Sequence, residues 1–282
     1  MKRQIGWTCN RLEGTLAMKH LKLIVLSLMA GGLFLAEPGA VSAMDPEPRI
    51  DTGVNELVRT RVQLKGAFLT KQVDSHLKQN DLVLMAVGDF LSANPDVSPE
   101  IAHSRMKRYQ RVAAGLRSIL AIGPDGSLLH DSYNLPAPDF NLGDRIYVRE
   151  AVRQGTGDLR INAPVAGRQS GIPFIPLTRG QFDVEGNATG VIVGILGPET
   201  LLPEDSDCAL CVSAVMTRDM DILVSRPSGL TFPADLISRI RNSHSATGLE
   251  LIDVNGSKSL VTWTKNIHAG VVTLSAELLP GQ

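Results

Sequence analysis

The amino-acid sequence predicts an α+β protein in which a long helix precedes two small antiparallel sheets, with helices on one side of each sheet. Apolar residues recur at spacings of three and four between Ile50 and Ala93, which is typical of an amphipathic helix. Runs rich in β-branched residues then follow as hairpins with short turns, which favours antiparallel pairing over parallel winding. The order strand, strand, helix, strands occurs twice, so we expect two similar modules behind one helix.

Length and charge limit the classes of function. The chain has 282 residues, of which 43% are hydrophobic, so it can fill the cores of one large or two ordinary domains. Its net charge is -1 and only 4% of its residues are aromatic. Because such a chain offers neither a basic surface nor a row of stacking rings, nucleic acid is excluded as the expected partner.

The segment from Met18 to Ala43 resembles a secretory signal. Lys19 and Lys22 precede an apolar run, and small residues end the segment at 41–43. We therefore expect residues 1–43 to be an upstream extension with a signal peptide, and a periplasmic or secreted protein that begins at Met44. A single N-terminal membrane anchor is the alternative, although the apolar run is shorter than the roughly 20 residues that span a bilayer.

Residues 44–114 are predicted to be helical. The long helix should cover about residues 51–93 and end at Asn94-Pro95. At 1.5 Å per residue it would measure roughly 60 Å, so it needs partners along most of its face. A second helix should begin at Ser98-Pro99, with serine as the cap and proline in the first turn, and end before Gly115.

Residues 115–197 form the first predicted module. A strand from Leu116 turns at 124–126 and returns as SLLHDS. A helix begins near Asp144, and two further strands, IPLTRGQFDV and GVIVGIL, meet around Glu185-Gly186.

The second module is predicted at 208–282, after an acidic, proline-containing linker at 198–207. It repeats two strands, a helix near Pro233, a hairpin closed by Asn255-Gly256 and a last strand. Cys208 and Cys211 form a C-x-x-C pair at its start. The pair lacks further zinc ligands at recognisable spacing and precedes a strand rather than a helix, which favours a local disulfide or two buried thiols.

The ordered runs GDRIYVREAVRQG, GRQSGIPFIPLTR and FDVEGNATGVIVGIL resemble the first module of double Cache domains. These PAS-like, PDC-type domains are the extracytoplasmic sensors of bacterial chemoreceptors, histidine kinases and diguanylate cyclases. The resemblance implies two tandem PAS-like modules, a membrane-distal one that binds the ligand and a membrane-proximal one, acting in signal transduction such as chemotaxis. Family members continue into a membrane helix and a signalling domain. A stand-alone sensor with a membrane-bound signalling partner, a relic, and the truncated sensor region of a receptor therefore stay open.

The resemblance places a ligand pocket between the first sheet and the segment after its second strand. Arginine binds carboxylates through two parallel hydrogen bonds, and tyrosine adds an apolar wall with one hydroxyl. We therefore expect a small anionic ligand, a carboxylate or an amino acid whose ammonium would meet Asp131 or Asp183. The only tryptophans, Trp7 and Trp263, lie outside this module, unlike the pocket tryptophan of the amino-acid-binding subgroup. The candidate ligand-binding residues are Arg145, Tyr147, Arg149, Arg168, Ser170, Thr178, Arg179, Asp183, Tyr133 and Asp131.

Catalysis is not expected. The sequence lacks a G-x-S-x-G elbow, an H-E-x-x-H pair, a P-loop and a G-x-G-x-x-G run, so no catalytic residue, cofactor or metal is predicted. His130 is interpreted as a strand-end residue, with a pocket role as the alternative. A non-catalytic adaptor or a scaffold that forms homodimers through the long helix is the alternative function.

Overall fold

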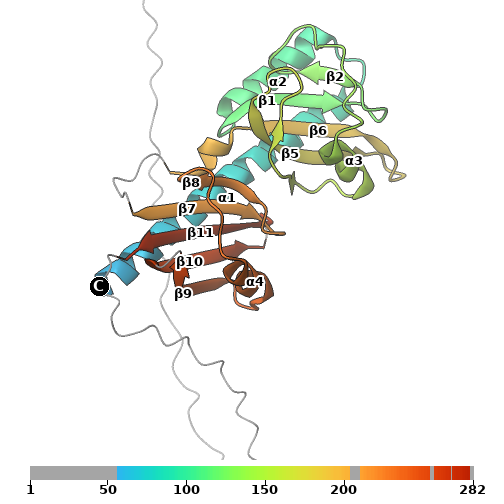
Figure 1. The fold of residues 1–282 in the computed structure, drawn as a ribbon. Coiled ribbons are helices and arrows are strands. Elements are labelled where there is room, and N and C mark those ends of the chain that lie inside the picture. The colour runs from blue at the N-terminus through green and yellow to red at the C-terminus, as the bar shows by residue number, and fades with distance from the viewer. Residues whose placement is uncertain (1–55, 204–209, 255–256, 268, 280–282) are drawn as a thin grey trace, which may run out of the picture. The chain divides into compact units, whose positions relative to one another are not determined.

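A computed structural model describes residues 56–203, 210–254, 257–267 and 269–279 (Figure 1). The predicted signal segment, Cys208 and the Asn255-Gly256 turn lie outside these ranges. The fold class is confirmed: a long helix precedes two antiparallel sheets with flanking helices. The helices are α1 (Glu56–Ala93), α2 (Pro99–Val112), α3 (Ile146–Arg153), the 3-10 helix η1 (Pro198–Leu201) and α4 (Ala234–Asn242).

Both predicted helix boundaries near residue 95 follow from local chemistry. α1 ends at Ala93, directly before Asn94-Pro95. The Ser98 side chain then accepts a hydrogen bond from the backbone N–H of Ile101 and caps α2, with Pro99 in the first turn. Among the described residues, no helix is long and apolar enough to cross a bilayer.

The first sheet has the strand order β2-β1-β6-β5-β3, and β4 pairs with β5 off this path. All of its pairs are antiparallel. Its strands are β1 (Leu116–Ile122), β2 (Leu128–Asp131), β3 (Arg160–Ile161), β4 (Val165–Ala166), β5 (Pro173–Phe182) and β6 (Ala188–Leu196).

Helices cover both faces of the first sheet, so the expectation of helices on one side is wrong for this module. Successive strand residues point to opposite faces. In β1, Ile119 and Ala121 therefore join the core under α1 and α2, whereas Ile122 packs with Tyr147 and Val148 of α3. The two faces of the first sheet therefore pack against different helices and belong to separate hydrophobic clusters.

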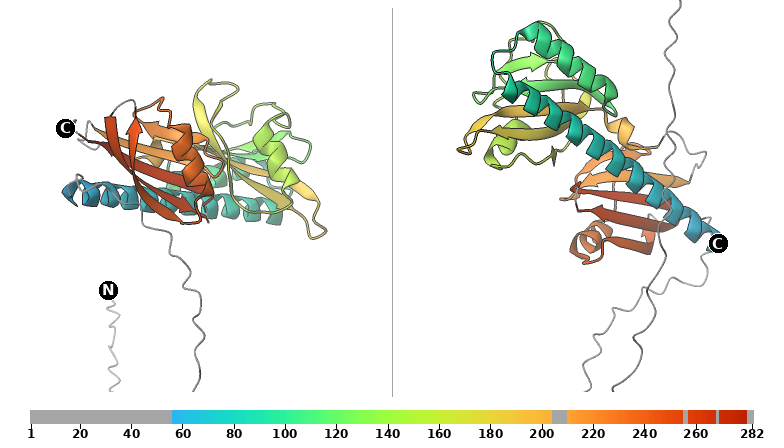
Figure 2. Two further views of the ribbon diagram at one scale, coloured as in Figure 1. Left: turned by 60° about the horizontal axis from the view of Figure 1, so that its bottom comes forward. Right: turned by 180° about the vertical axis from the view of Figure 1, so that it is seen from behind.

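The second sheet is also antiparallel, with the order β8-β7-β11-β10-β9. Leu236 and Ile240 of α4 pack on one face with Met216 and Trp263, and the other face contacts α1, so the expectation of helices on one side is wrong for this module too. Figure 2 shows α1 crossing one face of each sheet. The strands are β7 (Cys211–Thr217), β8 (Ile222–Arg226), β9 (Thr247–Val254), β10 (Ser257–Asn266) and β11 (Val271–Leu278).

The long helix is the shared core of both modules. Leu69, Val73 and Leu77 of α1 belong to one buried cluster that includes Ile175 of the first sheet and Val271 of the second. The predicted need for partners along the helix is met in this way, because each sheet covers a different stretch of α1.

Candidate ligand-binding site

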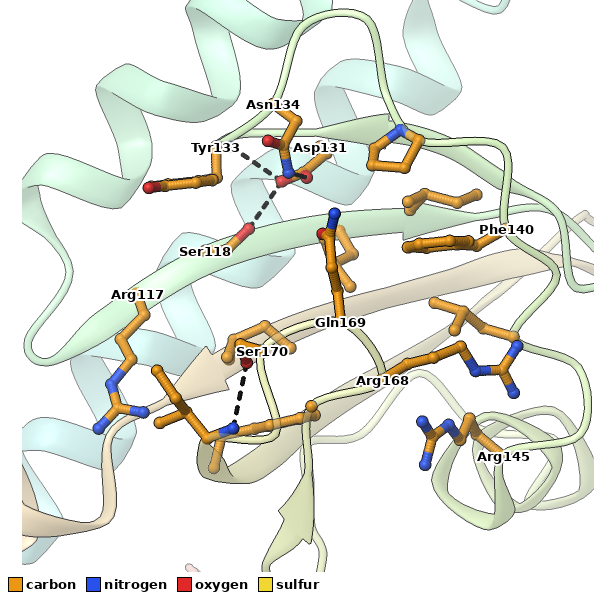
Figure 3. Close-up of a pocket in the computed structure, with 18 of the residues that line it drawn as sticks. Arg117, Ser118, Asp131, Tyr133, Asn134, Phe140, Arg145, Arg168, Gln169 and Ser170 are labelled. Atoms are coloured by element: carbon orange, nitrogen blue, oxygen red, sulfur yellow. Dashed lines mark hydrogen bonds between the residues drawn. The ribbon is translucent and has the colours of Figure 1, made fainter.

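A cavity of about 410 Å³ lies on the α3 side of the first sheet, within the size range of small-molecule sites. Strands β1 and β6 form its floor, and its walls are the segment between β2 and α3 and the turn between β4 and β5 (Figure 3). Its lining residues are Arg117, Ser118, Leu120, Leu128, Asp131, Tyr133, Asn134, Pro138, Phe140, Leu142, Arg145, Tyr147, Gly167, Arg168, Gln169, Ser170, Ile172, Phe174 and Ile195.

The buried Asp131 carboxylate organises one wall of the cavity. Its Oδ1 accepts hydrogen bonds from Ser118 Oγ and from the Tyr133 N–H, both at 2.8 Å. Its Oδ2 accepts from Asn134 Nδ2 at 2.7 Å. Because these bonds join β1 to the chain leaving β2, they fix the polar groups of this wall and leave the carboxylate capacity for one further donor.

Arg145 stands at the opposite end, directly before the first turn of α3. Its carbonyl accepts from the N–H groups of Val148 and Arg149, so the backbone is held while the side chain reaches the cavity. The Arg145 Nε is buried and has no hydrogen-bond partner among the described residues. Leaving a buried donor unpaired costs about 1–3 kcal/mol, and more when the group is charged, which favours a ligand that supplies an acceptor.

The two other arginines of the cavity already have partners. Arg168 donates to the Asn141 carbonyl at 2.8 Å and forms an ion pair with Asp144, which fastens the β4–β5 turn to the segment before α3. Arg117 forms an ion pair with Glu199 at 2.8 Å. Of the three arginines that line the cavity, Arg145 is therefore the one whose charge is most available to a ligand.

Tyr147 and its neighbours form the apolar part of the cavity. Its ring packs edge-to-face on Phe174 with 6.2 Å between centroids. Burial raises the pKa of the Tyr147 hydroxyl, and the nearby Arg145 and Arg168 offset part of that rise. The hydroxyl therefore stays protonated at neutral pH. The site combines Arg145, whose Nε is unpaired, with the Asp131 carboxylate and an aromatic wall.

The structure brings six of the ten candidate residues around this cavity. They are Asp131, Tyr133, Arg145, Tyr147, Arg168 and Ser170. Figure 3 shows Asp131 and Asn134 across the cavity from Arg145 and Arg168, with Gln169 extending between them.

The other four candidates lie elsewhere. Arg149 is exposed on α3. Arg179 forms an ion pair with Asp81 of α1, because it shares the strand face of Ile175 and Leu177. The remaining two have local partners: Thr178 Oγ1 accepts from Asn162 Nδ2 at 3.2 Å, and Asp183 accepts from Asn187 in the β5–β6 turn.

Several lining residues were missed by the sequence reasoning. Ser118 shares a strand face with Leu120, a signal that could have been used once the strand was assigned. Asn134 and Phe140 lie in an irregular segment without periodicity, so no sequence signal marked them. Within the described ranges, no group of three or more His, Cys, Asp or Glu side chains is placed to hold a metal ion.

No family model and no curated protein matches this chain in sequence. Solved structures do match it. The extracellular domain of rpHK1S-Z16, described as a histidine kinase, superposes with a TM-score of 0.70 at 19% identity, over 79% of this chain and 95% of that one. The protein has the double Cache fold.

Two ligand-binding domains with the double Cache fold were solved with amino acids bound. The Pseudomonas fluorescens chemoreceptor CtaA, in complex with L-leucine, gives a TM-score of 0.61 at 15% identity over 81% of this chain and 97% of that chain. Mlp24 with asparagine gives 0.55 at 14% identity over 79% and 92%. At these identities the likeness establishes the double Cache fold alone.

Proposed function

We propose that the protein is a non-catalytic, exported sensor domain that binds a small carboxylate-bearing metabolite in the cavity of its first module. The observation that carries this proposal is the buried, unpaired Nε of Arg145 in a cavity of metabolite size. A ligand carboxylate would supply the missing acceptor and neutralise the guanidinium through two hydrogen bonds.

An amino acid matches the opposite charges of Asp131 and Arg145 at the two ends of the cavity. The ammonium group of such a ligand would donate to Asp131, which has one acceptor position left, while its carboxylate meets Arg145. The similar domains solved with leucine and asparagine support this class. Phe140, Phe174 and Tyr147 provide the aromatic surface, in place of the tryptophan of the amino-acid-binding subgroup.

The hydroxyls of the cavity support binding rather than nucleophilic catalysis. Ser118 Oγ donates to Asp131, and Ser170 Oγ accepts from the Ile172 N–H at 3.2 Å. Both side chains therefore hold protein structure, and no histidine lies among the described lining residues to activate either of them.

We further propose that the segment up to Ala43 directs export and is removed before Met44, with an N-terminal anchor as the alternative. The signal would then pass to a membrane-bound partner. A scaffold that dimerises through α1 is the second candidate function, because Leu57, Leu64 and Phe68 of α1 are 60–66% exposed.

The test is a thermal-shift and calorimetry screen of the protein beginning at Met44 against organic acids, amino acids and amines. A ligand at 100 times its dissociation constant should add about 2.7 kcal/mol of stability. Arg145→Ala should abolish this shift and leave the unliganded melting temperature nearly unchanged. Arg149→Ala, an exposed neighbour on α3, is the matched control and should bind normally.

Binding of amines alone, or full binding by Arg145→Ala, would contradict the carboxylate site. A screen in which no compound binds would instead favour the dimerising scaffold, which sedimentation of the wild-type protein would then examine.

A further inference from the structure

A second cavity, of about 520 Å³, lies at the end of α1 near the β5–β6 turn. Gly88, Leu91 and Ser92 of α1 form one wall, and the α1–α2 connection and the ends of β1, β2, β5 and β6 form the others. Ala121 and Ile192 line this cavity and belong to the core under α1 and α2. The second cavity therefore opens on the face of the first sheet that is opposite to the face of the first cavity.

His130 supplies a hydrogen-bonding group to this cavity. It is half-buried on β2, opposite Ala121 of β1, and neither ring nitrogen has a partner among the described residues. Burial lowers the pKa of the imidazole below its ordinary value, so the ring is neutral at neutral pH. A neutral imidazole offers one donor and one acceptor.

Gln181 supplies a second polar group. Its amide lies against Gly88, where a Cβ atom would come within 2.4 Å of Oε1. Glycine within a helix costs about 1 kcal/mol relative to alanine, and here it makes room for this amide. Nε2 donates to the Gly180 carbonyl at 3.2 Å, whereas Oε1 accepts from no described residue.

The charge of the second cavity differs from that of the first. Its described lining includes no lysine or arginine. Its one carboxylate, Asp183, accepts from the Glu185 N–H at 3.0 Å and from the N–H and side-chain amide of Asn187 at 2.8 and 3.0 Å. A ligand carboxylate would meet this negative charge without a compensating cation, so the site disfavours an anion. The two hydrogen-bonding groups named above, His130 and Gln181, are neutral and suit an uncharged partner.

We propose that this cavity is a second ligand site, which takes an uncharged, largely apolar small molecule that hydrogen-bonds to His130 and Gln181. Leu91, Phe182 and Ile192 provide its apolar walls. The proposal goes beyond carboxylate binding and does not depend on it, because the two cavities lie on opposite faces of the sheet and differ in charge.

Phenol is a suitable probe because it combines an apolar ring with one hydroxyl. Titration of phenol into the purified protein should shift the His130 ring resonances saturably in NMR spectra, and acetate at the same concentrations should not. His130→Ala identifies these resonances by their disappearance.

Filling the cavity should remove this binding. Thr189 is exposed, lines the cavity and lies on β6, where an aromatic side chain is tolerated. Thr189→Phe should weaken phenol binding at least about tenfold, the effect expected for roughly 1.4 kcal/mol. Thr156→Phe, at an exposed threonine after α3, is the matched control and should bind phenol normally, as should Arg145→Ala.

The absence of a saturable His130 shift would overturn the proposal, and so would equal phenol affinity in Thr189→Phe and the wild type. Because Thr189→Phe could fold poorly, Gln181→Ala provides a second variant. Calorimetry should show weaker phenol binding by Gln181→Ala, and an unchanged affinity would equally contradict the site. Retained carboxylate binding by these variants separates this result from any failure of the first site.

Discussion

The half-buried imidazole of His130 should make the protein less stable at mildly acidic pH than at neutral pH. Burial holds the pKa of the folded-state ring below its ordinary value of 6.5. The unfolded chain therefore binds a proton more readily than the folded one as the pH falls through this value. The imidazole leaves stability unchanged well above pH 6.5 and reduces it progressively between that value and the lower folded-state pKa.

His130→Gln should remove this pH dependence, because glutamine keeps a polar side chain but does not titrate. Melting temperatures measured between about pH 7.5 and pH 5 should fall less in the variant than in the wild type. An equal fall in both proteins would show that protonation of His130 does not oppose folding.

The arginines show where sequence reasoning stops at the residue scale. The sequence supplied the side-chain type, and the family resemblance supplied the region. Whether a guanidinium is available depends on partners distant in sequence, such as Asp81 for Arg179 and Asp144 for Arg168. Strand alternation could have separated Arg179 from the cavity, but no pattern in the sequence shows that Arg145 Nε is unpaired.

At the scale of elements, α1 packs against the second sheet through a glycine. A Cβ atom at Gly66 would come within 2.4 Å of Thr262 Cγ2 on β10. The threonine is stiff about χ1, and its Oγ1 donates to the Gly248 carbonyl at 3.0 Å, so the methyl group cannot easily move away. The close approach of helix and sheet therefore depends on the missing side chain.

Gly66→Ala should destabilise the protein by about 1–3 kcal/mol through overpacking, although alanine is the better helix former. Thr262→Ser removes the clashing methyl group and keeps the hydroxyl. The double variant Gly66→Ala with Thr262→Ser should therefore regain most of the loss in chemical denaturation. If the single variant Gly66→Ala and the double variant were equally stable, the clash would be relieved by movement of the helix.

Elements with a strong local signal were predicted well, and elements held by distant contacts were not. The long periodic run gave α1, and Ser98-Pro99 gave the start of α2. Strands β3 and β4 have two residues each, too few to show alternation, and their place depends on pairing with β5. The covering of both sheet faces also escaped prediction, because apolar residues on both faces resemble a general hydrophobic run.

At the scale of the whole molecule, the two modules share an order of elements but differ in how the face under the short helix is filled. In the first module that face holds the arginine-containing cavity. In the second, Trp263 packs with Leu236 and Ile240 of α4, and its ring lies against Gly248, where a Cβ atom would come within 2.3 Å. A single large aromatic side chain thus occupies the space under α4 in the second module.

The shared core along α1 predicts that both modules unfold together. Since Leu69, Leu77, Ile175 and Val271 lie in one buried cluster, loss of one sheet exposes the helix that supports the other. Trp263 is the one tryptophan after Met44 and is 3% exposed, so its fluorescence reports on the second module. Thermal transitions followed by Trp263 fluorescence and by far-UV circular dichroism should coincide. A ligand bound by Arg145 in the first module should raise both midpoints equally, whereas a fluorescence midpoint unmoved by ligand would show that α1 does not join the modules into one cooperative unit.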